Sequence, residues 1–130
     1  MNKGIKIQVR FSDLDIMGHV NNSVYLSYFE YARVQYFGQL LGLNWDWKKH
    51  GVLLVRNEID YIKPILLTDV PEVFISVDGI GSKSFTLSYE VKVDGNVTTT
   101  GKSVLVCFDS SKNASIEIPV EMRTLLESVK

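Results

Sequence analysis

Apolar and polar residues alternate at the start of the chain, merge into one long apolar segment, and alternate again through most of the C-terminal half. Residues 5–10, IKIQVR, alternate in the way typical of a short half-buried strand. Residues 23–41 contain no proline and carry apolar residues at helical spacing, which predicts a long helix ending near Gly42. Because apolar residues lie on nearly all sides of this helix, we expect other structure or a partner to wrap it.

Beyond Gly51 the pattern predicts consecutive strands joined by short connections. Asp94-Gly95-Asn96 is a strong hairpin signal, because these residue types accept the left-handed backbone of tight turns. The tail from Pro119 predicts a terminal helix, and residues 44–50 predict a short helical turn. The four strands are expected at residues 52–65, 72–81, 84–95 and 97–109.

Consecutive strands with short turns imply an antiparallel sheet, so the expected fold class is α+β. One long apolar helix beside such a sheet suggests that the sheet curls around the helix. A length of 130 residues favours a single domain, residues 1–130, with a core large enough to fold alone.

Composition narrows the possible partners. The 14 basic and 15 acidic residues nearly balance, so no basic surface for nucleic acid is expected. No apolar stretch is long enough to span a membrane, and none resembles a secretory leader. The single cysteine, Cys107, lies in the apolar run SVLVCF, where we expect a small buried hydrophobe rather than a reactive thiol. We therefore expect a cytoplasmic protein.

Polar chemistry gathers in RFSDLDIMGHVNN, residues 10–22, immediately before the long helix. Asp15 precedes a glycine turn, and Asn21 or Asn22 can cap the helix. The start of a helix carries unpaired N–H groups and partial positive charge, which suit a developing oxyanion. A carboxylate beside such donors can attack a carbonyl or activate water, so the loop has the groups needed for acyl transfer.

The same residues have simpler interpretations. Asp13 and Asp15 could merely solvate a loop, which the residue types alone favour. His19 could orient the loop or bond a backbone carbonyl, and Gly18 could only supply a backbone angle forbidden to other residues. One histidine and two acids form a thin ligand set, so neither a metal nor another cofactor is expected.

The segment RFSDLDIMGHVNNSVYLSYFEYAR closely resembles the signature of the hotdog-fold acyl-CoA thioesterases, in the branch similar to 4-hydroxybenzoyl-CoA thioesterase. The resemblance continues through EIDYIKPILLTD and GSKSFTLSYEV, and so covers nearly the whole chain. It implies an antiparallel sheet wrapped around one long helix. It also implies that Asp15 is the catalytic carboxylate, acting as nucleophile or general base, and that the backbone N–H of Asn22 polarises the thioester carbonyl.

Other residues follow from the resemblance. His19 is a candidate for orienting Asp15 or the substrate, and the HVNN form resembles a subgroup that includes acyl-ACP thioesterases. We interpret Glu30 as a buried acid paired with Arg33 or a neighbouring strand. Trp45 and Trp47 could line an acyl pocket or pack over the helix end. The substrate-binding set is expected to comprise Gly18, Tyr25, Arg56, Lys83 and Ser84, with Arg56 approaching from a neighbouring subunit and Lys83 and Ser84 near the nucleotide of coenzyme A.

The sequence therefore predicts an acyl thioesterase acting on acyl-CoA or acyl-ACP, assembled as a homodimer or homotetramer through side-by-side sheets. A hotdog protein that binds acyl thioesters without hydrolysing them is the alternative, because a fold alone does not define a function. A thioester dehydratase ranks last, since neither His19 nor His50 follows the arrangement of that enzyme class.

Overall fold

A computed structural model describes residues 3–130 of the chain, and it confirms the predicted order of long helix, four long strands and terminal helix. Two further strands are very short, and a single 3-10 turn precedes the long helix. The elements are β1 Ile5–Lys6, η1 Phe11–Asp13, α1 Val24–Leu41, β2 Gly51–Tyr61, β3 Glu72–Ile80, β4 Ser84–Val93, β5 Asn96–Asp109, β6 Ala114–Ser115 and α2 Val120–Ser128.

The strands form one antiparallel sheet in the order β1-β3-β4-β5-β2, with β6 paired to the end of β5. The predicted hairpin at Asp94-Gly95 joins β4 to β5. The outer side of β2 has no neighbouring strand among the described residues. An 11-residue strand is thus left with one open edge.

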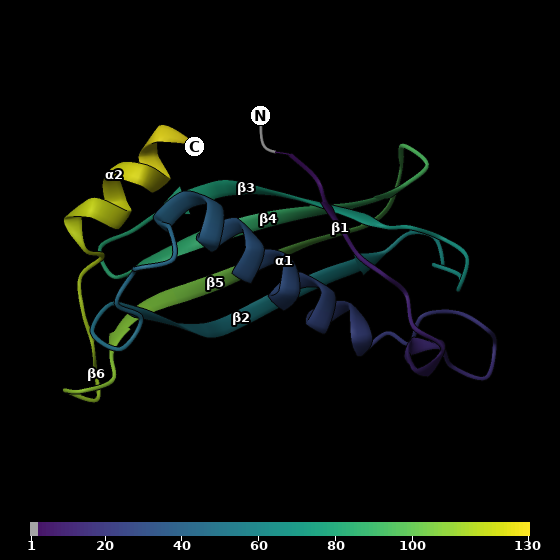
Figure 1. Cartoon of the computed structure of the whole chain (residues 1–130), viewed down its shortest axis with the longest axis horizontal. Helices are drawn as coiled ribbons and strands as arrows, with labels where there is room; N and C mark the ends of the chain where they lie inside the picture. The colour runs from purple at the N-terminus through teal and green to yellow at the C-terminus, as the bar shows by residue number, and fades with distance from the viewer. Residues whose placement is uncertain (1–2) are drawn as a thin grey trace.

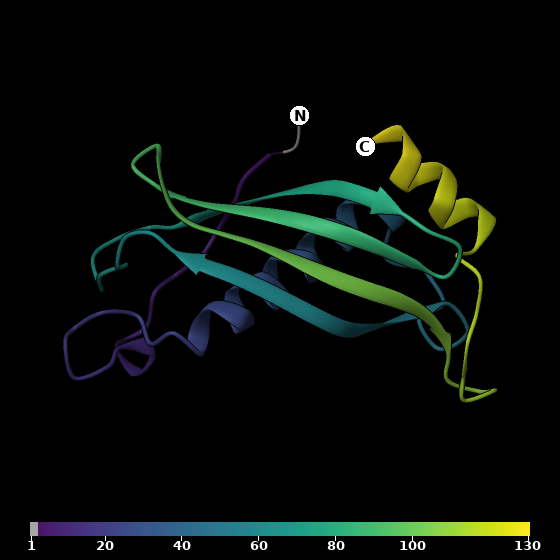
Figure 2. The ribbon, with the colours of Figure 1, turned by 180° about the vertical axis from the view of Figure 1, so that it is seen from behind.

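Helix α1 lies along one face of the sheet, and the opposite face has no helix over it among residues 3–130 (Figures 1 and 2). The loop before α1 lies at one end of the sheet, whereas α2 and β6 lie at the other end. Phe29 of α1 stacks on Tyr89 of β4, with ring centroids 4.1 Å apart. A side chain at Gly101 of β5 would meet the Phe29 ring at 2.8 Å, so this glycine permits the close approach of helix and sheet.

Two strands end four residues earlier than the sequence predicted, since β1 ends at Lys6 and not at residue 10, and β2 ends at Tyr61 and not at residue 65. The first strand has only two residues in the sheet, although Ile7 N–H still donates to Pro71 O at 2.8 Å. Strand β2 ends at Tyr61 instead of residue 65, because the next two N–H groups both turn onto Thr98 O and Pro64 has no N–H to continue the ladder. The short helical turn predicted within residues 44–50 is present, with His50 N–H donating to Asp46 O at 2.9 Å.

The long helix buries one face, not its whole circumference. Its buried residues include Phe29, which stacks on Tyr89 of β4, whereas Leu26, Tyr31 and Val34 are exposed in the isolated chain. The α+β class is confirmed. Because apolar residues of α1 are exposed in the isolated chain, the expectation that a partner covers this helix stays a prediction.

Candidate active site

The loop before α1 is a tight structure closed by its own backbone. Leu14 and Val20 form an isolated antiparallel bridge, and Asp15 N–H donates to His19 O at 2.7 Å. Gly18 N–H returns to Asp15 O at 3.0 Å, and this glycine has a φ of 77°. Residues with a Cβ are strained at such an angle, so the interpretation of Gly18 as the turn's conformational requirement is confirmed.

Asp13 anchors this loop from inside the protein. It is 1% exposed and accepts hydrogen bonds from Arg10 N–H at 2.9 Å, Arg10 Nη2 at 3.0 Å and Tyr28 Oη at 2.7 Å. Burial alone would raise the pKa of Asp13, but these donors outweigh it and lower the pKa. The idea that Asp13 merely solvates a loop is therefore wrong, because its carboxylate ties the loop to α1.

The carboxylate of Asp15 is held through one of its two oxygens. Oδ1 accepts hydrogen bonds from Met17 N–H at 2.9 Å and from His19 N–H at 3.2 Å. The second oxygen, Oδ2, accepts none from residues 3–130. The carboxylate is thus oriented by two backbone amides while its other oxygen has no donor from the described residues. His19 contributes its backbone to this orientation, and its side chain lines the adjoining cavity.

The backbone just before α1 leaves one donor without an acceptor among the described residues. Ser23, at the N-cap, makes no side-chain capping bond, and no acidic residue occupies the first turn. Two asparagines were expected as possible helix caps. Of these, Asn21 bonds the residue two positions ahead, because its Oδ1 accepts a hydrogen bond from Ser23 N–H at 3.0 Å. Asn22 O accepts a 3.0 Å bond from Tyr61 Oη, and Asn22 N–H has no acceptor among the described residues. The Asn22 N–H is therefore a free donor at this end of the helix, where the helix also carries positive partial charge, whereas the N–H groups of Ser23 and Val24 are both bonded to Asn21.

A cavity of about 280 Å³ joins the loop, the helix start and the segment after β2. It brings together four of the predicted site residues, Asp15, His19, Asn22 and Tyr25, and Gly18 lies in the same loop. The remaining lining comes from Val20, Tyr61, Ile62, Lys63 and Pro64.

Tyr25 and Tyr61 form the aromatic wall of this cavity. Their ring centroids lie 5.0 Å apart in an edge-to-face arrangement with an interplanar angle of 84°. Tyr25 is 2% exposed, and burial raises the pKa of its hydroxyl, which therefore stays protonated. The sequence-based site set missed Tyr61 and Lys63, although both lie in EIDYIKP, a segment already singled out by its resemblance to the thioesterases.

Three predicted substrate-binding residues lie away from this cavity within one chain. Arg56 is in the middle of β2, where its Nη2 pairs with Glu58 Oε1 at 2.6 Å. Ser84 is opposite Val106, far along β5 from the Thr99 position that pairs with Tyr61. Lys83 and Ser84 are consequently at the other end of the sheet from Asp15.

Two further interpretations are resolved by the geometry. Glu30 is exposed and has no ion pair with Arg33, so its interpretation as a buried, paired acid is wrong. Trp47 packs against Phe37 near the end of α1 with ring centroids 5.6 Å apart, and it also lines a separate cavity between α1 and β2.

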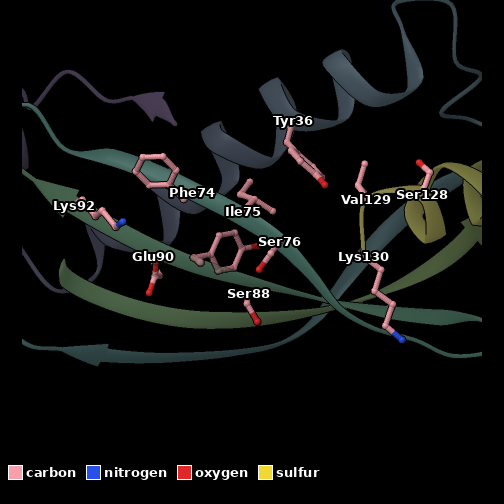
Figure 3. A pocket seen from close by; sticks show the side chains of 11 residues that line it. Tyr36, Phe74, Ile75, Ser76, Ser88, Glu90, Lys92, Ser128, Val129 and Lys130 are labelled. Atoms are coloured by element: carbon pink, nitrogen blue, oxygen red, sulfur yellow. The ribbon is translucent and has the colours of Figure 1, made fainter. Parts of the chain in front are cut away.

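Two other cavities are larger but contain none of the predicted catalytic residues. One, of about 490 Å³, lies beside β3, between Tyr36 of α1 and the end of the chain after α2 (Figure 3). The other, of about 510 Å³, lies between α1 and β2. Within residues 3–130, no cluster of three or more histidine, cysteine, aspartate or glutamate side chains suits a metal ion, and no helix has the length and apolarity needed to cross a membrane.

Comparison with known proteins agrees with this geometry. Residues 9–126 match the thioesterase-like superfamily. A solved thioesterase from Thermus thermophilus, in complex with coenzyme A and Zn, is 35% identical, with a TM-score of 0.85 over 97% of this chain and 92% of that one. The long-chain acyl-CoA thioesterase FadM of Escherichia coli is 28% identical over 95% of this chain and 96% of its own length. The uncharacterized protein YsmA of Bacillus subtilis is 28% identical over 95% of this chain and 84% of its own.

The fold is thus the hotdog arrangement of an antiparallel sheet along one long helix, as the sequence predicted. The chain belongs to the thioesterase-like superfamily.

Proposed function

We propose that this protein is an acyl thioesterase that hydrolyses acyl-CoA or acyl-ACP to a free carboxylic acid and a thiol. The observation that supports this function most directly is the pairing of opposite chemistries in one cavity. Asp15 has a free carboxylate oxygen, and Asn22 has a free backbone N–H at the start of α1. An anionic oxygen and a preorganised donor are the two groups that attack on a thioester carbonyl requires.

In this mechanism the thioester carbonyl oxygen accepts a hydrogen bond from Asn22 N–H, and the partial positive charge of the helix start polarises it. As a nucleophile, Asp15 Oδ2 attacks the carbonyl carbon, the C–S bond breaks to release thiolate, and water then cleaves the resulting anhydride. As a general base, Oδ2 takes a proton from water, hydroxide attacks the carbon, and the proton passes to the departing thiolate. Met17 and His19 amides hold Oδ1 in either route.

The surrounding residues have supporting roles in this proposal. Tyr25 and Tyr61 form an aromatic wall beside the carbonyl, and Tyr61 also holds the carbonyl group of Asn22. His19 contacts the substrate from the loop, and Gly18 allows the backbone conformation that the loop requires. Lys63 brings a cationic group to the cavity, which suits the phosphate-bearing part of a carrier.

We further propose that two copies pair through their β2 edges into one continuous sheet, as a homodimer or a dimer of such dimers. The open edge of β2 and the exposed Leu53, Leu54 and Val55 support this assembly. Antiparallel pairing would bring the N-terminal end of one β2 beside the C-terminal end of the other. Lys83 and Ser84 of one copy would then lie toward the Asp15 cavity of its partner, and Arg56, at the middle of β2, would lie near the symmetry axis between the two cavities.

The experiment is a panel of short, long and aromatic acyl groups, each carried on coenzyme A and on acyl carrier protein, with thiol release followed by absorbance. We expect hydrolysis of at least one series, with oxygen esters of the same acids as poor substrates. Tight binding of acyl-CoA without hydrolysis of any member would instead favour the alternative, a non-catalytic acyl-thioester binding protein.

A further inference from the structure

An apolar groove of about 510 Å³ runs between α1 and β2 and is separate from the Asp15 cavity. Valine, leucine, phenylalanine and tryptophan side chains supply most of its walls, a composition suited to a hydrocarbon chain. Only two charged residues line it, Glu30 and Arg33, both from α1. The apolar lining consists of Val34, Phe37, Leu43, Trp47, Val52, Leu54 and Leu105.

Arg33 is buried without a counter-charge. Its residue is 7% exposed, and no carboxylate of residues 3–130 lies within 4.0 Å of its guanidinium. Its one hydrogen bond runs from Nη1 to Tyr89 Oη at 3.2 Å. A guanidinium has five N–H donors, so most of its capacity is unused. Every fully buried side-chain nitrogen of the described chain has a partner, so the unbonded nitrogens of Arg33 are not fully buried, and Arg33 is one of the residues that line the groove.

Nearby polar groups do not neutralise Arg33. Burial raises the pKa of Tyr89, so its hydroxyl is a neutral acceptor and not a phenolate. Ser103 Oγ donates a 2.6 Å hydrogen bond to Asn57 Oδ1, so these two side chains bond each other. A buried charge is costly unless it is paired, and a carboxylate matches the planar fork of a guanidinium in shape and charge.

From these contacts we infer that the groove binds the acyl chain of a substrate that ends in a carboxylate, and that Arg33 binds this terminal carboxylate. The substrate class is thus the monothioester of a dicarboxylic acid. This inference rests on the proposed thioesterase function, whose substrate it specifies.

The position of Arg33 sets a length for this acyl group. Arg33 follows Asn22 by eleven residues, which at the rise of an α-helix corresponds to about 16 Å along the axis. It also lies at the middle of α1, which runs from Val24 to Leu41. In a symmetric pair joined through β2 with antiparallel helices, the axial distance to the partner's helix start is therefore about the same. Only a medium to long chain spans it.

Glu30 does not argue against an anionic ligand. Its side chain is exposed and outside ion-pair distance of Arg33, so solvent screens its charge more strongly than the buried guanidinium is screened.

The test uses two series of non-hydrolysable thioethers of coenzyme A, so that binding is measured whether or not the protein hydrolyses thioesters. One series carries alkyl chains of ten, twelve and fourteen carbons, and the other carries the same chains ending in a carboxylate. Isothermal titration calorimetry gives the Kd of each. We expect the wild-type protein to bind the best carboxylate-ended member about ten- to a hundredfold more tightly than its alkyl match, the range of a charge-assisted bond to a buried group.

Arg33→Met should bring the ratio of the two Kd values to about one, and Arg33→Lys should restore part of the preference, because lysine keeps the charge without the planar fork. Arg123→Met, a change in α2 outside the groove, is the matched control and should keep the wild-type ratio. Turnover of the corresponding thioesters should show the same preference in kcat/KM.

Equal affinity of the wild-type protein for both series would overturn the inference. A carboxylate preference that survives Arg33→Met would do so as well. If Arg33→Met dissociates the oligomer and weakens both series equally, Arg33 pairs with a partner subunit and the inference is also wrong. Carboxylate selectivity without turnover of any thioester would contradict the proposed catalysis and leave this binding site supported.

Discussion

Tyr28 Oη donates a 2.7 Å hydrogen bond to Asp13 Oδ2 and thereby links α1 to the loop that carries Asp15. The same carboxylate receives Arg10 N–H and the Arg10 side chain. Burial raises the pKa of Tyr28, and the adjacent Asp13 raises it further, so the phenol remains a donor. The position of the loop that carries Asp15 therefore depends on a buried contact between a tyrosine and a carboxylate.

Tyr28→Phe should destabilise the protein by about 1 to 3 kcal/mol, because it removes a donor from a buried carboxylate. Urea unfolding followed by circular dichroism measures this change. Since the loop loses an anchor, kcat should also fall while the alkyl-chain dependence of binding is retained. Tyr31→Phe, an exposed change on the same helix, is the control and should leave stability nearly unchanged.

The Asp13 contact also predicts a dependence on pH. The folded state lowers the pKa of Asp13 below its ordinary value of 3.8. Its contribution to stability is therefore complete above that value and is lost as the pH falls through the folded pKa. The stability difference between wild type and Tyr28→Phe should be constant near neutral pH and shrink in acid below about pH 4. A difference that grows on acidification would contradict this assignment.

Gly18→Ala should disturb catalysis more than its small size suggests. No heavy atom lies within 4 Å of the position that a Cβ would take, so crowding is not the obstacle. The φ of 77° is the obstacle, and holding alanine there costs about 1 to 3 kcal/mol, which favours a shifted loop. We expect kcat to fall markedly with the fold intact by circular dichroism. Gly79→Ala, in open space at an ordinary φ, is the matched control.

Much of the fold could be predicted from sequence because its signals are local. The helix expected over 23–41 is observed at Val24–Leu41, and the Asp94-Gly95 hairpin forms where its residues indicated. The early end of β2 was missed, because it results from two N–H groups converging on Thr98 in a neighbouring strand. Pairing across such distances leaves no periodic pattern in a single sequence.

The site residues also divide into those predictable from local sequence and those that depend on long-range contacts. Asp15, His19 and Asn22 are close in sequence, so their shared cavity was predictable, whereas Tyr61 reaches Asn22 across 39 residues. The burial of Asp13 and Arg33 was not predictable from charge alone, because their partners Tyr28 and Tyr89 lie 15 and 56 residues away.

Cys107 should be unreactive in the folded protein. The side chain is buried, its Sγ lies 3.8 Å from the Sδ of Met122, and burial raises the pKa of its thiol to about 11. At pH 8 the reactive thiolate is therefore scarce. Ellman's reagent should label no thiol in native protein and one thiol per chain in denaturant. Rapid labelling of the native protein would contradict the packing between β5 and α2.

The proposed assembly predicts that β2 is protected by a second copy. Val55 lies near the middle of β2 and is 58% exposed in the isolated chain. Val55→Glu would bring like charges close together across a symmetric strand pair, so it should yield monomers by sedimentation equilibrium and lower thioesterase activity. Val70→Glu, equally exposed but in the connection after β2, should leave the assembly unchanged. A wild-type protein that is monomeric while active would contradict this pairing.

The central claim is that Asp15 performs the chemistry at the start of α1, and single-turnover hydrolysis of the best acyl thioester by Asp15→Asn tests it most directly. The substitution keeps the shape of the side chain and its acceptor for the Met17 and His19 amides, but removes the anionic oxygen. We predict a rate loss of about a hundredfold to ten-thousandfold with substrate affinity largely retained. Asp60→Asn, an exposed carboxylate outside the cavity, should hydrolyse at the wild-type rate. A folded Asp15→Asn protein with wild-type turnover would contradict the assignment.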